Sequence, residues 1–246
     1  MPEFNIEKVK VFLDDIDIAV ETGTFRGGGT RVMSENFEKV ITIELDPILY
    51  EETKSTMCEE GYTNVDFVLG DSATVIADIA KTVKDPVMFY LDAHWSGDST
   101  VNWSESEWKG YNTNTAHKGK SDKPTSQEQV PLDIEVKVIA RYFEPKGIIY
   151  IDDLDKFSIT GEGLKDKAFK GEDYSHLNLK MFREYLGTRL RTWKNLKNQQ
   201  LIIQFDKIPT TAYEIWKQKL YYNTIFKLNF YSNQIFFYLR WKFKGK

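Results

Sequence analysis

Acidic residues recur at one kind of position in this 246-residue chain, the point where a short apolar run ends. The runs are rich in Val and Ile, as in KVITIE and GIIYI, which is typical of buried β-strands. Carboxylates bind cations, accept hydrogen bonds and take up protons, so a group of them could hold a positively charged or hydroxyl-rich ligand. The acids at these positions are Glu21, Glu44, Asp71, Asp92, Asp152 and Asp153.

A glycine-rich segment, ETGTFRGGGT, follows the first apolar run at residues 21–30. Glycine has no Cβ, so such a segment lets backbone N–H groups and the start of a helix approach a ligand closely. Glu21 would repel a pyrophosphate there but would suit a cationic or hydroxyl-rich ligand. No Gly-Lys-Ser/Thr follows, and the glycine spacing departs from the dinucleotide-binding fingerprint. The segment therefore predicts a ligand loop that differs from both phosphate-binding motifs.

The apolar pattern predicts the elements that must position these acids. Five runs predict strands, and they cover residues 18–20, 39–45, 65–69, 86–91 and 147–151. Helical spacing over residues 131–143 predicts a helix before the fifth strand. Strands that alternate with helices form a parallel sheet covered on both faces. Ligands bind at the carboxyl ends of the strands in such a sheet, so the acids should share one crevice.

Two more strands complete the predicted sheet. Residues 201–205 and 212–216 are typical of a closing antiparallel pair, whereas residues 181–190 form the best helical segment of the second half. The predicted fold is α/β: a doubly wound, mostly parallel, Rossmann-like sheet of seven strands. We expect a single domain over residues 1–246, because this length and the 41% hydrophobic content provide one substantial core.

Composition limits the expected partners and compartment. The net charge of −4 gives no positive field that would draw the protein onto nucleic acid, so nucleic acid is not an expected partner. The lone cysteine, Cys58, cannot form an internal disulfide, which favours a reducing compartment. The N-terminal segment lacks the pattern of a secretion signal, and no uncharged run has membrane-spanning length. A cytoplasmic protein is therefore expected.

Two segments depart from the alternation of strands and helices. Residues 96–130 form a polar insertion after the fourth strand with aromatic residues such as Trp103 and Trp108, and either a substrate lid or a mobile surface insertion fits them. Residues 220–246 form an aromatic-rich C-terminal extension that could dock as an amphipathic helix on the body or on a second subunit of a homo-oligomer. Its terminal Arg and Lys residues also leave contact with an anionic membrane open.

Three motifs together resemble the class I S-adenosylmethionine-dependent methyltransferases over residues 17–157: the ETGT–GGGT segment, Glu44, and Gly70-Asp71-Ser72. The resemblance implies S-adenosylmethionine as cofactor, with Glu21 facing its positive charge. It also implies that Glu44 binds the ribose hydroxyls and that Asp71 and Ser72 hold the adenine amino group. Glu44 and Asp71 could instead each cap the next helix. The implied cofactor-binding residues are Glu21, Thr22, Gly23, Thr24, Gly28, Thr30, Glu44, Asp71, Ser72 and Asp92.

A narrower resemblance concerns the ends of the fourth and fifth strands. LDAHW at residues 91–95 and YIDD at residues 150–153 resemble the metal-binding segments of sugar O-methyltransferases of the macrocin type. This resemblance implies a divalent ion, usually magnesium, held by Asp92, Asp152 and Asp153. Three carboxylates make a hard oxygen site that suits Mg²⁺, Mn²⁺ or Ca²⁺, and a cation would offset their repulsion. Alternatively, Asp152 and Asp153 cap a turn and Asp92 pairs with a lysine.

The same resemblance implies a reaction in which a metal and a base activate a sugar hydroxyl for methylation. Asp92 and His94 are the implied catalytic residues, although Ala-His-Trp replaces the second acid and tyrosine usual in that group, and a structural histidine is the alternative. His117 and His176 are weaker candidates for the base. The expected substrate is a nucleotide-linked sugar or a precursor of a surface polysaccharide or natural-product glycan. A catechol-type O-methyltransferase and a non-catalytic cofactor-binding protein are the competing functions.

Overall fold

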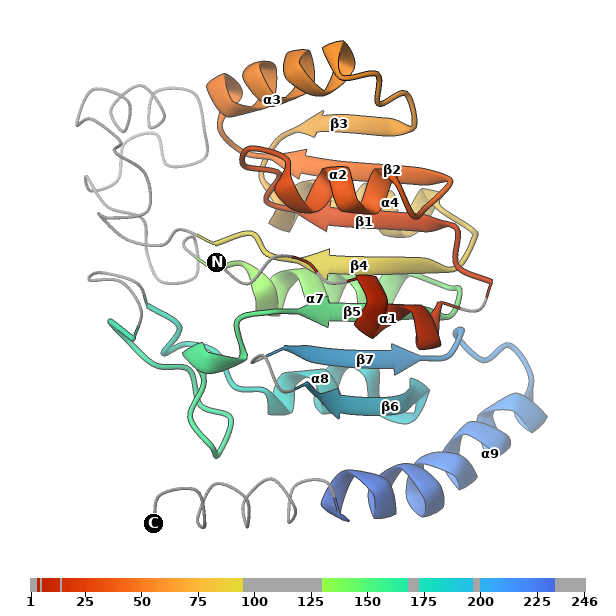
Figure 1. The fold of residues 1–246 in the computed structure, drawn as a ribbon. Helices are drawn as coiled ribbons and strands as arrows, with labels where there is room; N and C mark the ends of the chain where they lie inside the picture. The colour runs from red at the N-terminus through yellow and green to blue at the C-terminus, as the bar shows by residue number, and fades with distance from the viewer. Residues whose placement is uncertain are drawn as a thin grey trace.

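A seven-stranded sheet runs through the centre of the protein (Figure 1), in a computed structural model that describes residues 4, 6–13, 15–94, 130–167, 173–196 and 200–232. The strand order is β3-β2-β1-β4-β5-β7-β6. Strands β1 to β5 pair in parallel, and β7 pairs antiparallel with both β5 and β6. The predicted mostly parallel, Rossmann-like sheet is therefore confirmed. The strands are β1 Ile18–Thr22, β2 Lys39–Glu44, β3 Val65–Leu69, β4 Val87–Leu91, β5 Gly147–Ile151, β6 Leu190–Asn195 and β7 Leu201–Phe205.

Helices cover both faces of this sheet, with α4, α7 and α8 behind it and α1 and α2 in front in the view of Figure 1. The α-helices are α1 Ile6–Val9, α2 Gly28–Ser34, α3 Pro47–Glu59, α4 Ser72–Thr82, α7 Leu132–Tyr142, α8 Lys180–Leu186 and α9 Ala212–Tyr221. Short 3-10 turns are η1 Lys10–Phe12, η3 Leu154–Lys156 and η4 Gly187–Arg189, and η5 Tyr222–Phe226 is a π-helical turn after α9.

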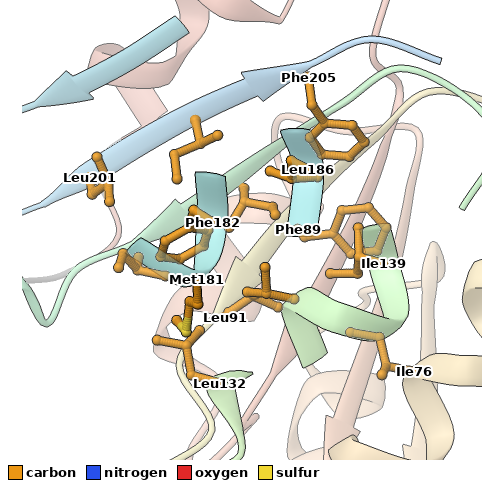
Figure 2. Close-up of a cluster of buried hydrophobic side chains, with 14 of the residues drawn as sticks. Ile76, Phe89, Leu91, Leu132, Ile139, Met181, Phe182, Leu186, Leu201 and Phe205 are labelled. Atoms are coloured by element: carbon orange, nitrogen blue, oxygen red, sulfur yellow. The ribbon is translucent and has the colours of Figure 1, made fainter. Parts of the chain in front are cut away.

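Strand β4 packs against a hydrophobic core on each face, because successive side chains of a strand point to opposite faces. Phe89 and Leu91 belong to the larger core, which α4, α7 and α8 cover. Figure 2 shows this core, in which Phe89 lies near Ile139 of α7. Met88 and Tyr90 belong to the second core, on the face of α1 and α2. Every residue of β4 is buried, so the strand holds its carboxyl end rigidly between the two helical layers.

Two acids from the end of the strands begin the helices that follow. The Asp46 carboxylate accepts hydrogen bonds from the backbone N–H groups of Ile48 and Leu49, and Pro47 occupies the first position of α3. The Asp71 carboxylate accepts one from the backbone N–H of Ala73 at the start of α4. Both acids therefore satisfy donors that a helix N-terminus leaves without partners.

The prediction of a strand at residues 212–216 is wrong, because these residues begin helix α9. The sequence carries the reason: the Thr211 hydroxyl accepts from the Glu214 backbone N–H, while the Glu214 carboxylate accepts from the Thr211 N–H, a capping box. The antiparallel partner of β7 is β6, which starts within the segment predicted as helical. That helix ends early, since Gly187 adopts a φ of +51° and the chain then turns into the sheet.

The described part of the C-terminal extension continues α9 as a helix to residue 232. Phe226 is 2% exposed and lies in the larger core, and the Phe230 ring meets the Trp193 ring of β6 edge-on with centroids 5.2 Å apart. The extension therefore docks on the body through one face. Residues 233–246 and most of the insertion, residues 95–129, lie outside the described residues. None of the described helices combines the length and apolar composition needed to cross a lipid bilayer.

Candidate active site at the strand ends

The ends of β1 and β4 meet closely, and the glycine loop lies where they meet. The register aligns Thr22 with Leu91, and the Asp92 backbone N–H donates to the Thr22 carbonyl over 3.1 Å. Gly23 follows with a φ of +86°, and a Cβ on it would lie 2.8 Å from the Asp92 carbonyl oxygen. This contact explains the glycine, because a larger residue would push the two strand ends apart.

Glu21 is held inside the site by hydroxyl groups. Its side chain is 2% exposed, and its Oε2 accepts hydrogen bonds from the Thr30 hydroxyl at 2.5 Å and the Thr42 hydroxyl at 2.7 Å. A Cβ on Gly29 would lie 2.6 Å from Oε1, so the loop passes directly over the carboxylate. Burial raises the pKa of Glu21 to about 8. A cation bound beside Glu21 would lower that pKa and stabilise the charged form.

Glu44 at the end of β2 accepts hydrogen bonds from two backbone N–H groups, one in the glycine loop and one just after β2. Its Oε2 accepts from the Phe25 N–H at 2.7 Å, and its Oε1 accepts from the Asp46 N–H at 2.9 Å. Since Asp46 caps α3, helix capping does not account for Glu44. The hydrogen bond to Phe25 instead joins the end of β2 to the glycine loop. The side chain is 7% exposed, and burial raises its pKa.

Asp71 follows the capping interpretation, since its carboxylate accepts from the Ala73 N–H at 3.0 Å. The neighbouring Ser72 is 6% exposed, and its side chain stabilises the charged form of Glu135, a buried carboxylate of α7. Thr24 shares a 2.5 Å hydrogen bond with the Thr42 hydroxyl. The roles of these residues toward a cofactor stay predictions.

Asp92, His94 and Asp153 converge at the ends of β4 and β5. The His94 Nδ1 lies 3.3 Å from Asp92 Oδ1 and 3.2 Å from Asp153 Oδ2, and the three candidate ligand atoms lie within 4.8 Å of one another. The Tyr174 hydroxyl donates to Asp153 Oδ2 over 2.9 Å. We call these three residues the Asp-His-Asp cluster. They form the group with metal-ligand geometry among the residues that the structure describes.

Asp152 lies beside this cluster with a different partner. The Tyr90 hydroxyl hydrogen-bonds both Asp152 Oδ2, at 2.9 Å, and Asp92 Oδ2, at 3.2 Å. Burial, with the nearby charges of Asp92 and Asp153, raises the pKa of Asp152 to about 8. Burial also raises the pKa of Asp92. Of the three predicted metal ligands, the structure therefore brings two together with His94 and holds the third through a tyrosine.

A pocket opens from the cluster toward α7. It is small, with room for about one water molecule, and part of it is open to solvent. One side is apolar, with Leu91, Leu132 and Ile151 among its lining residues, and the Asp-His-Asp cluster lines another. No Lys or Arg stands among the described residues that line it. The pocket is therefore a partly buried, acidic space at the ends of β4 and β5.

Glu135 in the first turn of α7 is a pocket residue that the sequence analysis did not single out. Its side chain is 1% exposed, and the nearby Thr22 and Ser72 side chains offset only part of the cost of burying its carboxylate. Its Oε1 has no hydrogen-bond partner within the described part of the chain. Burial raises the pKa of Glu135 to about 7. A signal existed: with Leu132, Val136 and Ile139, position 135 falls on the buried face of the predicted helix.

The remaining histidines lie apart from the cluster or cannot be located. The His176 Nε2 is 3.1 Å from the Val130 carbonyl oxygen, a contact that fixes the chain near the pocket. His117 lies outside the described residues. His94 is thus the histidine that the structure brings to the predicted site.

Comparison with solved structures shows that the sheet and its flanking helices have a known fold. A Klebsiella pneumoniae protein described as a "putative O-methyltransferase" superposes with a TM-score of 0.51 over 84% of this chain and 83% of its own, at 12% sequence identity. The chain has the Rossmann-like methyltransferase fold. No protein-family profile matches the sequence.

Sequence similarity to curated proteins is local. A protein-L-isoaspartate O-methyltransferase from Methanococcus maripaludis is 39% identical over 74 residues, which are 27% of this chain and 35% of that protein. An uncharacterized protein from Methanocaldococcus jannaschii is 32% identical over 69 residues, which are 28% of this chain and 26% of that protein. The matches therefore span about a third or less of each relative's length. One of these two local matches is therefore to a protein named as a methyltransferase.

Proposed function

We propose that this protein is an S-adenosylmethionine-dependent methyltransferase that transfers a methyl group to a sugar hydroxyl with the help of a divalent cation. The observation that carries the proposal is the meeting of Glu21, Glu44 and the Asp-His-Asp cluster along one edge of a methyltransferase-fold sheet. The local similarity to an O-methyltransferase supports the same chemistry. The substrate is a nucleotide-linked sugar or a precursor of a surface polysaccharide or natural-product glycan.

The cofactor lies along the ends of β1 and β2 in this proposal. Gly23 and Gly29 let the loop pack against the end of β4 and against the Glu21 carboxylate, because neither position has room for a Cβ. The Glu21 carboxylate faces its positive charge, and the hydroxyls of Thr30 and Thr42 orient that carboxylate. Glu44 accepts from the ribose hydroxyls with the lone pairs that its two backbone hydrogen bonds leave over.

The acceptor lies at the ends of β4 and β5, beside the pocket. Asp92 and Asp153 offer carboxylate oxygens to a divalent cation, because their ligand atoms lie within 4.8 Å of each other, and Asp152 lies beside them on the Tyr90 hydroxyl. A cation there would lower the pKa of a coordinated hydroxyl and hold it in place. Tyr174 orients Asp153, and Tyr90 ties Asp92 to Asp152, so hydroxyl donors fix the carboxylates. His94, with Asp92 beside it, is the sequence-based candidate for taking the proton.

The remaining expectations belong to this proposal as well. We expect the enzyme to act in the cytoplasm on a carbohydrate partner rather than on nucleic acid, and the net charge of −4 supports that preference. A second copy of the chain is a further proposed partner, through the end of the C-terminal extension, and an anionic membrane is the alternative. Catechol-type acceptors and the isoaspartyl carboxyl group named for the curated relative are the comparison substrates.

Methyl transfer from radiolabelled S-adenosylmethionine tests the function. Purified protein is incubated with nucleotide sugars, catechol and an isoaspartyl peptide, each with and without a chelator, and Asp92→Asn is the inactive control. We expect methylation of a sugar that the chelator abolishes and an added divalent cation restores. Transfer to catechol or the peptide alone would overturn the sugar assignment. Full activity in chelator would overturn the metal dependence, and a protein that binds no S-adenosylhomocysteine in calorimetry would overturn the function itself.

A further inference from the structure

The His94 imidazole lies between the carboxylates of Asp92 and Asp153. Its Nδ1 lies 3.3 Å from Asp92 Oδ1, 3.2 Å from Asp153 Oδ2 and 3.2 Å from the Asp92 carbonyl oxygen, so one imidazole nitrogen and two carboxylate oxygens lie close together. The His94 side chain is 11% exposed, which keeps this centre largely away from bulk water. Asp152 directs its Oδ2 to the Tyr90 hydroxyl instead. The donor set is therefore mixed nitrogen and oxygen.

A second observation in the same pocket points to a ligand. The Glu135 side chain is 1% exposed and lines the pocket, and its Oε1 lacks a partner among the described residues. A buried carboxylate oxygen without a hydrogen bond is costly, so the site is completed when a donor enters the pocket. Water or a hydroxyl group bound to a cation is such a donor. The described lining residues include three carboxylates and no Lys or Arg, which also favours a cation.

We propose that Asp92, His94 and Asp153 bind a first-row transition-metal dication such as Mn²⁺ in preference to Mg²⁺, with His94 Nδ1 as a direct ligand. Magnesium favours oxygen ligands, whereas imidazole nitrogen favours transition metals, so one histidine changes the preference of the site. Glu135 accepts a hydrogen bond from water on the cation across the pocket. This inference deepens the proposed function and rests on it only for the use of the cation in methyl transfer. It makes His94 a ligand instead of the base.

Metal binding to the full chain tests the inference without any acceptor. Metal-free protein is titrated with Mn²⁺ and with Mg²⁺ by calorimetry, and the Mn²⁺ complex is examined by pulsed EPR. We expect Mn²⁺ to bind at least about tenfold more tightly than Mg²⁺, with nitrogen modulation from His94 in the EPR signal. His94→Gln should weaken Mn²⁺ binding at least about tenfold, remove the nitrogen modulation and bring the two affinities close together.

Two further variants separate this ligand set from the one that the sequence predicts. Asp152→Asn keeps an oxygen that accepts from Tyr90, so Mn²⁺ affinity should stay within about fivefold of wild type. Glu144→Gln, an exposed acid at the far end of α7, is the matched control and should bind as wild type does. Thermal unfolding verifies that each variant is folded.

Three results would overturn the inference: no Mn²⁺ binding at millimolar concentration, equal affinity for Mg²⁺, or loss of binding in Asp152→Asn with His94→Gln unaffected. Calorimetry of S-adenosylhomocysteine on the same samples separates the two proposals. Binding of that nucleoside by a protein that ignores Mn²⁺ would leave the methyltransferase proposal standing while the metal inference fails.

Discussion

Glu21, Glu135 and Asp152 are carboxylic acids held inside the protein, and burial raises the pKa of Glu21 to about 8, of Glu135 to about 7 and of Asp152 to about 8. An acid with a raised pKa in the folded state binds more protons there than in the unfolded chain. Stability contributed by protonation is thus present at low pH and is lost as pH rises toward the folded pKa. The protein without ligands should therefore be least stable at a pH high enough for these buried carboxylates to be charged.

Glu21→Gln should remove part of this pH dependence. Between pH 6 and pH 8 the wild-type free energy of unfolding should fall by on the order of 2 kcal/mol through Glu21 alone, since one pKa unit corresponds to about 1.4 kcal/mol. The variant should show a flatter profile, because glutamine accepts from Thr30 without ionising. Urea unfolding of metal-free, cofactor-free protein at several pH values measures this. Parallel profiles for the two proteins would show that Glu21 ionises normally.

Residue-scale features were predictable only in part. The acids at the strand ends follow from where each apolar run stops, and the structure brings Asp92 and Asp153 together. The partners of Asp152 and His94 depend on side-chain directions after β5 and on Tyr90, which no local pattern specifies. Glu135 could have been identified from its position on the buried face of the predicted helix, because a charged residue is rarely buried without a functional or structural reason.

Helix α2 begins with two glycines that differ in their surroundings. A Cβ on Gly29 would lie 2.6 Å from the Glu21 carboxylate, whereas a Cβ on Gly28 meets nothing within 4 Å. The Thr30 and Thr42 hydroxyls hold that carboxylate, so it cannot move aside freely. The loop and strand β1 therefore fit together at one position and leave space at the next.

Gly29→Ala and Gly28→Ala form a matched pair on this helix. We expect Gly29→Ala to destabilise the protein by about 1–3 kcal/mol and to weaken binding of S-adenosylhomocysteine, because the new methyl group displaces Glu21. Gly28→Ala should be neutral or stabilising by up to about 1 kcal/mol, since alanine is the better helix former. Thermal unfolding and calorimetry measure both effects. Equal behaviour of the two variants would contradict the close packing at Gly29.

The extension after β7 also presents two distinct faces. Phe226 is 2% exposed in the larger core, and two residues later Leu228 is 72% exposed. Phe226→Ala should cost about 3–5 kcal/mol of stability, the usual range for a buried phenylalanine, while Leu228→Ala should change it by less than about 0.5 kcal/mol. Urea unfolding compares them. A small effect of Phe226→Ala would mean that the extension does not dock on the body in solution.

Element prediction succeeded where apolar runs were continuous and failed where two signals competed. Strands β4 and β5 were predictable because both of their faces are covered, which makes their two runs apolar throughout. Strand β6 was missed because its sequence, LRTWKN, does not alternate: its buried residues, Leu190 and Trp193, are three positions apart, and the pairing with β7 shifts register between Leu190 and Thr192. The capping box at Thr211 and Glu214 indicates a helix, whereas the apolar residues within 212–216 favour a strand; in the structure the segment is helix α9.

At the scale of the molecule, the strand order β3-β2-β1-β4-β5-β7-β6 brings the ends of β1, β2, β4 and β5 to one edge of the sheet. The alternation of strands and helices was sufficient to predict that edge. The acceptor could not be predicted in the same way, because the pocket is lined from the end of β4, α7, β5 and Tyr174, whose side chains come together only in the folded protein. Substrate choice is therefore a property of the assembled fold.

A crystal structure of the protein with S-adenosylhomocysteine and Mn²⁺ tests the central proposal most directly. The account predicts the nucleoside across the glycine loop, with its ribose hydroxyls within hydrogen-bond distance of Glu44 and its sulfur directed toward the Asp-His-Asp cluster. The cation should lie between Asp92, His94 and Asp153. A nucleoside bound elsewhere, with Glu44 and the cluster on opposite sides of an empty crevice, would contradict the account.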